Sequence, residues 1–194
     1  MVLSTYYAQA GFVSLRNDDI NERLLAIFER LSNQDLSALE PLYDLCAGPI
    51  YGLALWRTGS SADAADVVHS VFIRLAKNSR KLAGVKKPRA YLLQAASHAA
   101  IDIVRKRRTS DISIQSPEFV EPHTTDERLI LRTTELESAL LRLSNRQREA
   151  IYLRYFCDLS FAEISDITGV SLFTAAARCR LGLARLRKIM GVKR

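Results

Sequence analysis

Residues 144–188, SNRQREAIYLRYFCDLSFAEISDITGVSLFTAAARCRLGLARLRK, decide the fold of the C-terminal part of the chain. Ser160 and Glu163 frame an S-x-x-E capping box, in which each side chain accepts a hydrogen bond from a backbone N–H that the first helical turn leaves unpaired. A helix is therefore expected directly after Ser160. Gly169 stands where a left-handed residue commonly ends a helix, and Ser171 can cap the next helix. The apolar face of the first helix is expected at Phe161, Ala162, Ile164 and Ile167.

The second helix of this pair separates apolar from polar positions. At 100° per residue, its core side carries Leu172, Ala175, Cys179, Leu183, Leu186 and Met190, and its other side carries Thr174, Ala177, Arg178, Leu181, Arg185 and Lys188. The end of the chain has seven basic residues and no acidic one, namely Arg178, Arg180, Arg185, Arg187, Lys188, Lys193 and Arg194. Such a surface suits phosphates, although a solvated helix end is the alternative, because cations also favour the C-terminus of a helix.

A supporting helix precedes this pair. Ser144 and Gln147 form a second capping box, and the helix that follows runs through Arg148, Ile151, Leu153 and Tyr155. Three helices around one small core predict a helix-turn-helix domain, whose last helix lies in a DNA groove.

Composition limits the class of protein. The chain has 194 residues, 48% of them hydrophobic, and a net charge of +7, so one or two packed domains and an acidic polymeric partner are expected. Nucleic acid and anionic membrane both fit this charge. The longest uncharged apolar runs, Leu45–Trp56 and Ala90–Ile101, are about 12 residues, well short of a membrane span. No basic residue precedes Arg16, which argues against a secretory signal, so we predict a cytoplasmic protein without a membrane span.

The residues that usually carry covalent chemistry form no pattern. Cys46, Cys157 and Cys179 are odd in number and far apart, so core thiols are expected instead of disulfides or a zinc ribbon. The three histidines lack metal-ligand spacing, and no phosphate loop, nucleophile elbow or paired-carboxylate site is found. We predict no catalytic residue, no metal, no cofactor and no enzymatic activity. Because glycine and proline are sparse and no stretch alternates with period two, the predicted fold class is all-α.

Charge and composition divide the chain into four parts. We predict an N-terminal extension over 1–19, a helical domain over 20–108, an acidic linker over 109–130 and the helix-turn-helix domain over 131–190. The linker is rich in Ser, Thr and Pro and is expected to be flexible. Its acidic residues either shield one of the basic domains or are simply hydrated.

The N-terminal domain is predicted to consist of several helices. Residues 21–31 bury Leu24, Ile27, Phe28 and Leu31, and residues 36–56 form two stretches broken near Gly48 and Pro49. Ser60 and Asp63 cap a helix over 62–77, whose core face is Ala65, Val68, Phe72 and Leu75. After a basic loop at 78–87, Pro88 begins a helix that buries Leu92, Ala95, Ala96, Ala99 and Ile103.

Three motifs in this order resemble the extracytoplasmic-function (ECF) group of bacterial sigma-70 factors. Residues 64–75, AADVVHSVFIRL, are similar to the family's A-E-D-[LV]-V-Q-E-V-F-L-R-L helix. Residues 87–105, KPRAYLLQAASHAAIDIVR, resemble N-P-R-A-W-L-x-x-I-A-R-N followed by D-x-x-R. Residues 143–149, LSNRQRE, and 159–164, LSFAEI, resemble L-P-x-R-Q-R-E and L-S-Y-A-E-I. The resemblance implies sigma domains 2 and 4 joined by a linker, and a chain that recruits RNA polymerase to promoters.

The resemblance also implies three sets of binding residues. Contacts with core RNA polymerase would come from Asp63, Asp66, His69 and Ser70. The loop at 78–87 would hold a flipped base of the -10 element, and DNA contacts there would come from Lys86, Lys87, Arg89, Tyr91, Gln94, His98, Arg105 and Lys106. Contacts with the -35 element would come from Ser171, Thr174, Arg178, Arg180 and Arg185. The expected partners are core RNA polymerase, promoter DNA and an anti-sigma factor.

The predicted recognition helix departs from the family pattern. Where the family often has G-T-V-K-S-R, residues 173–178 read FTAAAR. Alanine offers no hydrogen bond to a base edge, so readout of the -35 element is expected to narrow to a few side chains or to DNA shape. This departure favours an alternative function, a sigma mimic that sequesters an anti-sigma factor without reading promoters. A DNA-binding regulator that acts without polymerase is a further alternative, and His69 and His98 are equally compatible with buried structural positions.

Overall fold

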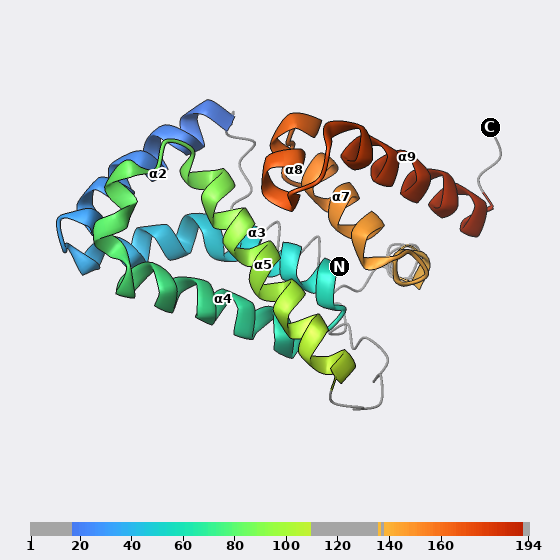
Figure 1. Cartoon of the computed structure of the whole chain (residues 1–194), viewed down its shortest axis with the longest axis horizontal. Coiled ribbons are helices and arrows are strands. Elements are labelled where there is room, and N and C mark those ends of the chain that lie inside the picture. The colour runs from blue at the N-terminus through green and yellow to red at the C-terminus, as the bar shows by residue number, and fades with distance from the viewer. Residues whose placement is uncertain (1–16, 110–135, 137, 192–194) are drawn as a thin grey trace, which may run out of the picture.

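The computed structural model describes residues 17–109, 136 and 138–191, and all regular structure in this part of the chain is helical (Figure 1). The helices are α2 (Asn17–Ser32), α3 (Leu39–Thr58), α4 (Ser61–Lys77), α5 (Pro88–Thr109), α7 (Asn145–Tyr155), α8 (Phe161–Thr168) and α9 (Leu172–Ile189), with short 3-10 helices η1 (Leu36–Ala38) and η2 (Ser79–Gly84). The all-α prediction is confirmed. The predicted flexible linker lies almost entirely outside the described residues.

Helix α3 corrects one prediction. It continues through Gly48 and Pro49, where a break was expected. A proline inside a helix removes one hydrogen bond and costs about 3 kcal/mol. The cost is offset by packing, because α3 contacts α4, α5 and α7 and buries a long series of side chains: Leu42, Cys46, Ile50, Leu53, Ala54, Leu55 and Trp56. The carbonyl of Pro49 also accepts a hydrogen bond from the hydroxyl of Tyr152 at 3.2 Å.

The other N-terminal helices follow the predicted pattern with small shifts. Helix α2 starts earlier than expected, at Asn17, and buries Leu24, Ile27, Phe28 and Leu31 as predicted. The hydroxyl of Ser60 caps α4 by accepting the N–H of Asp63 at 3.3 Å. The core face of α4 was partly wrong, since Ala65 is exposed and the buried residues are Ala64, Val67, Val68, Val71 and Leu75. Helix α4 contacts both α3 and α5, so its buried stripe is wider than one predicted face.

The C-terminal helices confirm the predicted caps. Ser144 and Gln147 close one capping box, Ser160 and Glu163 close the other, and Gly169 has φ 66°. Helix α8 buries only Ile164 and Ile167, and Ala162, which was predicted in its apolar face, is exposed. In α9, Ala175, Cys179 and Leu186 are buried as predicted. Leu172 and Met190 were also expected in the core but are 45% and 41% exposed, because both stand at the ends of the helix.

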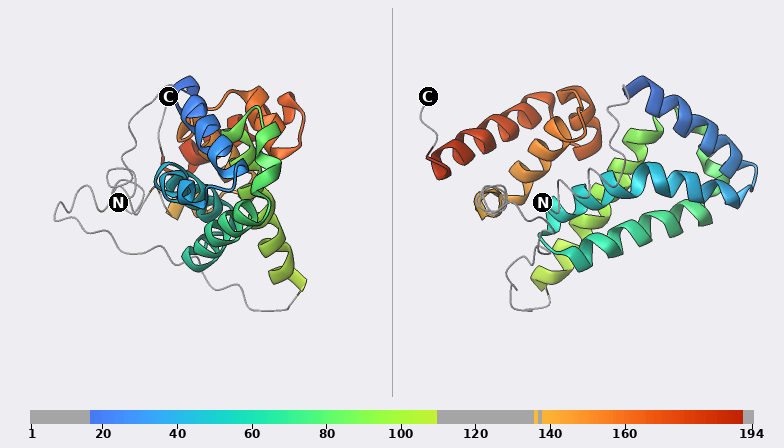
Figure 2. Two further views of the ribbon diagram at one scale, coloured as in Figure 1. Left: turned by 90° about the vertical axis from the view of Figure 1, so that its left-hand side faces the viewer. Right: turned by 180° about the vertical axis from the view of Figure 1, so that it is seen from behind.

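The helices fall into an N-terminal group, α2 to α5, and a C-terminal group, α7 to α9, and these two groups pack directly against each other. Helix α7 contacts α3, and α8 contacts α5. Figures 1 and 2 show the C-terminal helices directly beside the N-terminal ones. Trp56 of α3 meets Tyr152 of α7 at a ring distance of 5.4 Å, and Phe156 stacks on Tyr152 at 5.5 Å. The buried apolar side chains therefore form one continuous core across both groups. The sequence analysis did not predict this junction.

Candidate nucleic-acid interface

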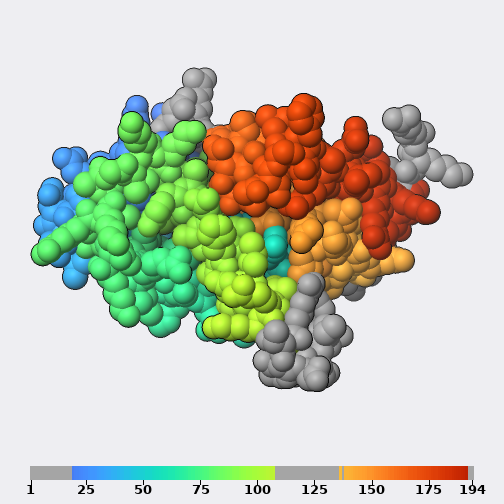
Figure 3. Space-filling model, viewed as in Figure 1, coloured from blue at the N-terminus to red at the C-terminus, as the bar shows by residue number. Residues whose placement is uncertain are grey.

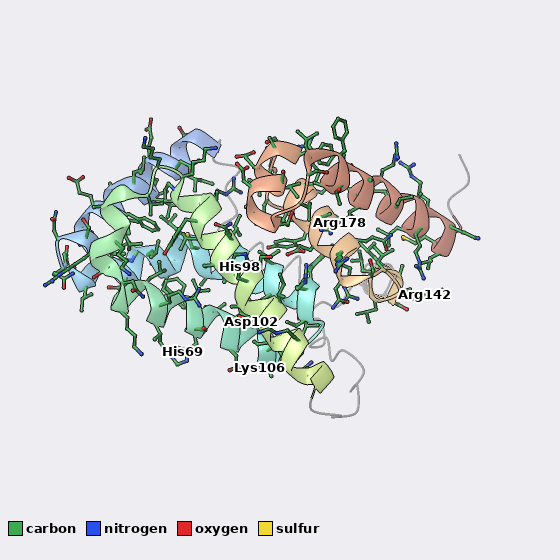
Figure 4. The ribbon with its side chains drawn as sticks, in the orientation of Figure 1. His69, His98, Asp102, Lys106, Arg142 and Arg178 are labelled. Carbon is green, nitrogen blue, oxygen red and sulfur yellow. The ribbon has the colours of Figure 1, made fainter. Side chains whose placement is uncertain are left out.

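The outer part of α5 carries polar side chains in a row. His98, Asp102 and Lys106 are exposed and follow one another along the helix (Figure 4). Arg105 is also exposed and lies 3.5 Å from Asp102. The exposure of His98 excludes the buried structural role that the sequence left open. This part of α5 is accessible to a large ligand on the side shown in Figures 3 and 4.

The first turns of α5 are held by the C-terminal helices. The guanidinium of Arg89 donates to the carbonyl of Cys157 at 2.6 Å, and the amide of Gln94 donates to the carbonyl of Asp166 at 3.3 Å. The ammonium of Lys87 lies 3.7 Å from the carboxylate of Asp166. Three side chains predicted to contact the -10 element thus have partners in the C-terminal group.

Tyr91, which was predicted to contact DNA at the -10 element, is not fully exposed. Its ring is half-buried and meets the ring of Phe28 edge-on, with 6.1 Å between the ring centres. The phenol ring therefore contributes to the core between α2 and α5. Lys86, just before α5, is exposed.

A buried polar cluster joins the two groups at the centre of their interface. The carboxylate of Glu149, 1% exposed, forms an ion pair with Arg57 and accepts a hydrogen bond from the hydroxyl of Ser97 at 2.6 Å. These residues come from α7, α3 and α5, respectively. Arg148 donates from Nε to the carbonyl of Trp56 at 2.8 Å. Burial, with the nearby charge of Arg57, lowers the pKa of the Arg148 guanidinium.

The sequence analysis missed Arg57, Ser97 and Glu149 as a group. A glutamate inside a helix with basic neighbours is usually exposed to solvent, so the local sequence does not predict that Glu149 is buried. Arg57 and Glu149 are more than 90 positions apart in the chain, and nothing in the sequence alone indicates that they form a pair.

The predicted polymerase-binding residues separate into two environments on α4. Asp66, His69 and Ser70 are exposed, and His69 points away from the body of the molecule (Figure 4). Asp63 is buried instead, with Arg107 of α5 2.8 Å from its carboxylate. Burial raises the pKa of Asp63, and the charge of Arg107 opposes this rise.

On α9, most of the predicted DNA-binding residues are exposed, and Arg178 is the exception. Ser171, Thr174, Arg180 and Arg185 are exposed, and the Ser171 hydroxyl accepts the Thr174 N–H at 3.1 Å. Arg178 is half-buried, and the charges of Glu149 and Arg57 act on its guanidinium. Burial and the charge of Arg146 lower its pKa, and a smaller effect of Glu149 raises it.

The capped C-terminal helices and the cations of α5 and α9 together indicate a class of protein. A capped helix pair with a left-handed glycine between the helices and a cationic last helix is a DNA-binding helix-turn-helix domain. The structure attaches it to a second helical domain whose long helix α5 also presents cations. Within the described residues, no group of His, Cys, Asp and Glu is arranged to hold a metal ion. None of the described helices is long and apolar enough to span a membrane.

The family follows from both domains. Residues 42–110 match Sigma-70 region 2, and residues 133–186 match Sigma-70, region 4. The chain belongs to the sigma-70 family, in the ECF group. It is 25% identical to the ECF RNA polymerase sigma factor SigK of Mycolicibacterium vanbaalenii over 89% of this chain and 92% of SigK, and 25% identical to SigW of Bacillus subtilis over 82% and 92%.

A solved structure shares the fold. The match is to a chain of the co-crystal structure of the sigma factor RpoE with the anti-sigma factor NepR from Bartonella quintana. The TM-score is 0.67 and the identity 21%, over 80% of this chain and 98% of the other. The matched relatives are named as sigma factors, and nothing in the comparisons favours the sigma-mimic alternative.

Proposed function

We propose that this chain directs RNA polymerase to a set of promoters in the cytoplasm, with α5 contacting the -10 element and α9 the -35 element. The observation that carries the proposal is the presence, in one chain, of both sigma regions, each with a helix that presents cations: α5 with Arg105 and Lys106, and α9 with Arg180 and Arg185. The mechanism is binding and strand separation, without covalent chemistry.

The chemistry of α5 suits the capture of a single strand. Cations that follow a backbone contribute salt-dependent affinity, and unstacked bases are caught by aromatic or planar side chains. Lys86, His98, Arg105 and Lys106 are exposed, and we propose that they take this role. Arg89 and Gln94 are proposed to contact the strand only after they leave Cys157 and Asp166.

The two domains must therefore separate when both promoter elements are bound. The elements lie about 25 base pairs apart, which is roughly 85 Å of duplex at 3.4 Å per pair. In the structure α5 contacts α8 and α8 contacts α9, and packed helices lie about 8–10 Å apart. The closed arrangement cannot span the promoter, so we propose that polymerase and DNA bind an opened form.

Polymerase itself is proposed to bind the exposed face of α4. Asp66, His69 and Ser70 share this face, whereas Asp63 is held by Arg107 and is proposed to act through the position of α4. Asp66→Ala should weaken binding to core polymerase and leave binding to a -35 duplex unchanged. Glu22 is an exposed acidic residue on α2, so Glu22→Ala is the matched control and should change neither polymerase binding nor binding to the -35 duplex.

An anti-sigma factor is a further proposed partner. The RpoE chain with the same fold is found in a complex with NepR. For the present chain, the proposal rests on the family and on the exposed cationic face of α9, which an acidic protein surface could cover.

One experiment tests the function as a whole. Promoters are mapped after forced expression in the source organism, and purified core polymerase is incubated with the full chain and a mapped fragment. Reactive unpaired thymines at the -10 element are expected only when the chain is present. If the chain does not associate with core polymerase, the proposal is wrong; if it associates but never opens DNA, the promoter-reading part is wrong.

A further inference from the structure

The outer face of α9 carries an exposed apolar ridge. Phe173 is 82% exposed, although a phenylalanine is normally covered, and Leu181 is 57% exposed. At 100° per residue, Phe173, Ala177, Leu181 and Ala184 lie within an arc of about 80° on the side opposite the buried Ala175, Gly182 and Leu186. We call these four residues the α9 ridge.

Cations flank the α9 ridge on both sides. Arg180 and Arg187 lie along one edge and Arg185 along the other, and all three are exposed. Lys188 continues the ridge beyond Ala184, and α9 has no acidic residue. An apolar strip with cations on both edges does not suit an apolar protein surface, because binding there would remove water from the arginines without supplying anionic partners.

DNA matches this pattern. The two phosphate backbones that border the major groove are anionic, and the floor of the groove carries one apolar group, the C5-methyl of thymine. The N-terminal residues of a recognition helix are the ones that reach base edges. Phe173 stands in the first turn of α9, and Ala177, which is half-buried, lies one turn further along the same face.

The first turn of α9 is also rigid. The hydroxyl of Ser171 accepts the N–H of Thr174 at 3.1 Å and lies 2.8 Å from the Thr174 hydroxyl. This cap fixes the backbone on both sides of Phe173, so little conformational freedom would be lost when the ring enters a groove. The two hydroxyls already bond to each other, so the polar side chains of this turn are partly engaged.

We propose that the α9 ridge reads the -35 element through the methyl groups of thymines, with Phe173 and Ala177 as the residues that determine specificity. The exposed arginines on either side hold the phosphates of the two strands. The inference rests on the proposed promoter-reading function. It explains how a recognition helix with three consecutive alanines can distinguish bases without hydrogen bonds from those positions.

The test removes the methyl groups without changing base pairing. Polymerase holoenzyme containing the full chain is bound to a mapped promoter fragment, and to the same fragment with deoxyuridine in place of every thymine in the -35 element only. Each methyl group contacted should contribute roughly fourfold in affinity. The wild-type chain should therefore prefer the thymine fragment, and Phe173→Ala should bind both fragments more nearly equally.

Leu181→Ala is the matched control, because Leu181 is an exposed member of the ridge two turns beyond Phe173 and should leave most of the thymine preference intact. Neither substitution removes a buried side chain, so both variants should melt at the wild-type temperature. Equal wild-type affinity for the two fragments would overturn the inference while leaving the promoter-reading function standing. A loss of polymerase association in Phe173→Ala, with the thymine preference unchanged, would also overturn it and would assign the ridge to a protein partner. Failure of the wild-type holoenzyme to bind either fragment would instead refute the proposed function.

Discussion

The two helices proposed to contact DNA differ in how the structure presents them. The beginning of α5 is covered by the C-terminal helices, which engage Lys87, Arg89 and Gln94. The outer face of α9 is open, with Phe173, Arg180 and Arg185 exposed. The described conformation thus leaves accessible the helix proposed to bind the -35 element, and it partly masks the helix proposed to bind the -10 element.

The difference arises from the chemistry of the two faces. At the interface, the hydroxyl of Ser97 on α5 donates a hydrogen bond to the buried carboxylate of Glu149, which forms an ion pair with Arg57. A buried ion pair of this kind adds little net stability, but it is costly to break on one side. No other described helix covers Phe173 and Leu181 of the α9 ridge, so these two side chains remain exposed.

The largest effect is expected from removing the buried carboxylate at the interface that covers α5. Glu149→Ala leaves Arg57 and Ser97 without their buried partner and should lower the free energy of unfolding of the full chain by about 3–5 kcal/mol. Urea denaturation measures this loss. Glu22→Ala, at an exposed position, should stay within about 0.5 kcal/mol of wild type. A loss below about 1 kcal/mol for Glu149→Ala would mean that the cluster is not buried in solution.

The second prediction opens the interface without touching a charge. A Cβ on Gly52 of α3 would clash with the hydroxyl of Tyr152 of α7 and would stand 2.7 Å from its Cζ. Tyr152 cannot easily move aside, because it is fully buried against Trp56 and Phe156. Gly52→Ala should disfavour the closed arrangement by about 1–3 kcal/mol, although alanine itself favours the helix by about 1 kcal/mol.

Small-angle scattering should show a larger radius of gyration for Gly52→Ala, and a single-stranded -10 oligonucleotide should bind more tightly. Thiol labelling gives a second measurement. Burial raises the pKa of Cys157 to about 12, so this thiol should react slowly at pH 8 in the wild type and faster in the variant. Gly84→Ala is the control, since a Cβ there meets no atom within 4 Å. A more compact variant with unchanged Cys157 labelling would contradict the masked-helix interpretation.

The third prediction concerns the exposed cations of α9. Arg185→Ala removes one exposed cation from α9 and should weaken binding of the full chain to a -35 duplex, while lowering the slope of log affinity against log salt concentration by about 0.9. Arg23→Ala, an exposed cation on α2, is the control and should leave the slope unchanged. An unaltered slope for Arg185→Ala would remove this residue from the DNA contacts.

The smallest effect is expected at the edge of the interface. Asp166 meets Lys87 at 3.7 Å, and both side chains are more than 60% exposed. Exposed pairs contribute about 0–1 kcal/mol, so Asp166→Ala should change the free energy of unfolding by less than about 1 kcal/mol and should barely affect Cys157 labelling. A large effect would show that the edge, and not the cluster at Glu149, holds the domains together.

Capping residues in the sequence predicted where several helices begin and end. The serine caps at Ser60, Ser144, Ser160 and Ser171 and the left-handed Gly169 all depend on residues within four positions of one another, so they can be recognised before the fold is known. Pro49 shows the limit of such reasoning. Its local penalty predicts a break, but packing on α3 from three other helices outweighs it.

The same limit applies to the candidate site. Exposure of Asp66 and Arg185 agrees with the predicted helix faces, because helical period alone places them away from the core. The sequence left open whether His69 is buried, and the structure shows that it is exposed. The engagement of Arg89 and Gln94 depends on partners more than 60 positions away. The roles assigned to these residues in binding remain predictions.

The all-helical fold, the capped helix pair and the cationic character of α5 and α9 could be predicted from the amino-acid sequence, because each follows from spacing within a few turns. The burial of Glu149 between two domains, the covering of the start of α5 and the exposure of Phe173 depend on how the helices pack. Burial is a property of what packs on a residue, and the residues that pack on Glu149 come from three helices far apart in the chain.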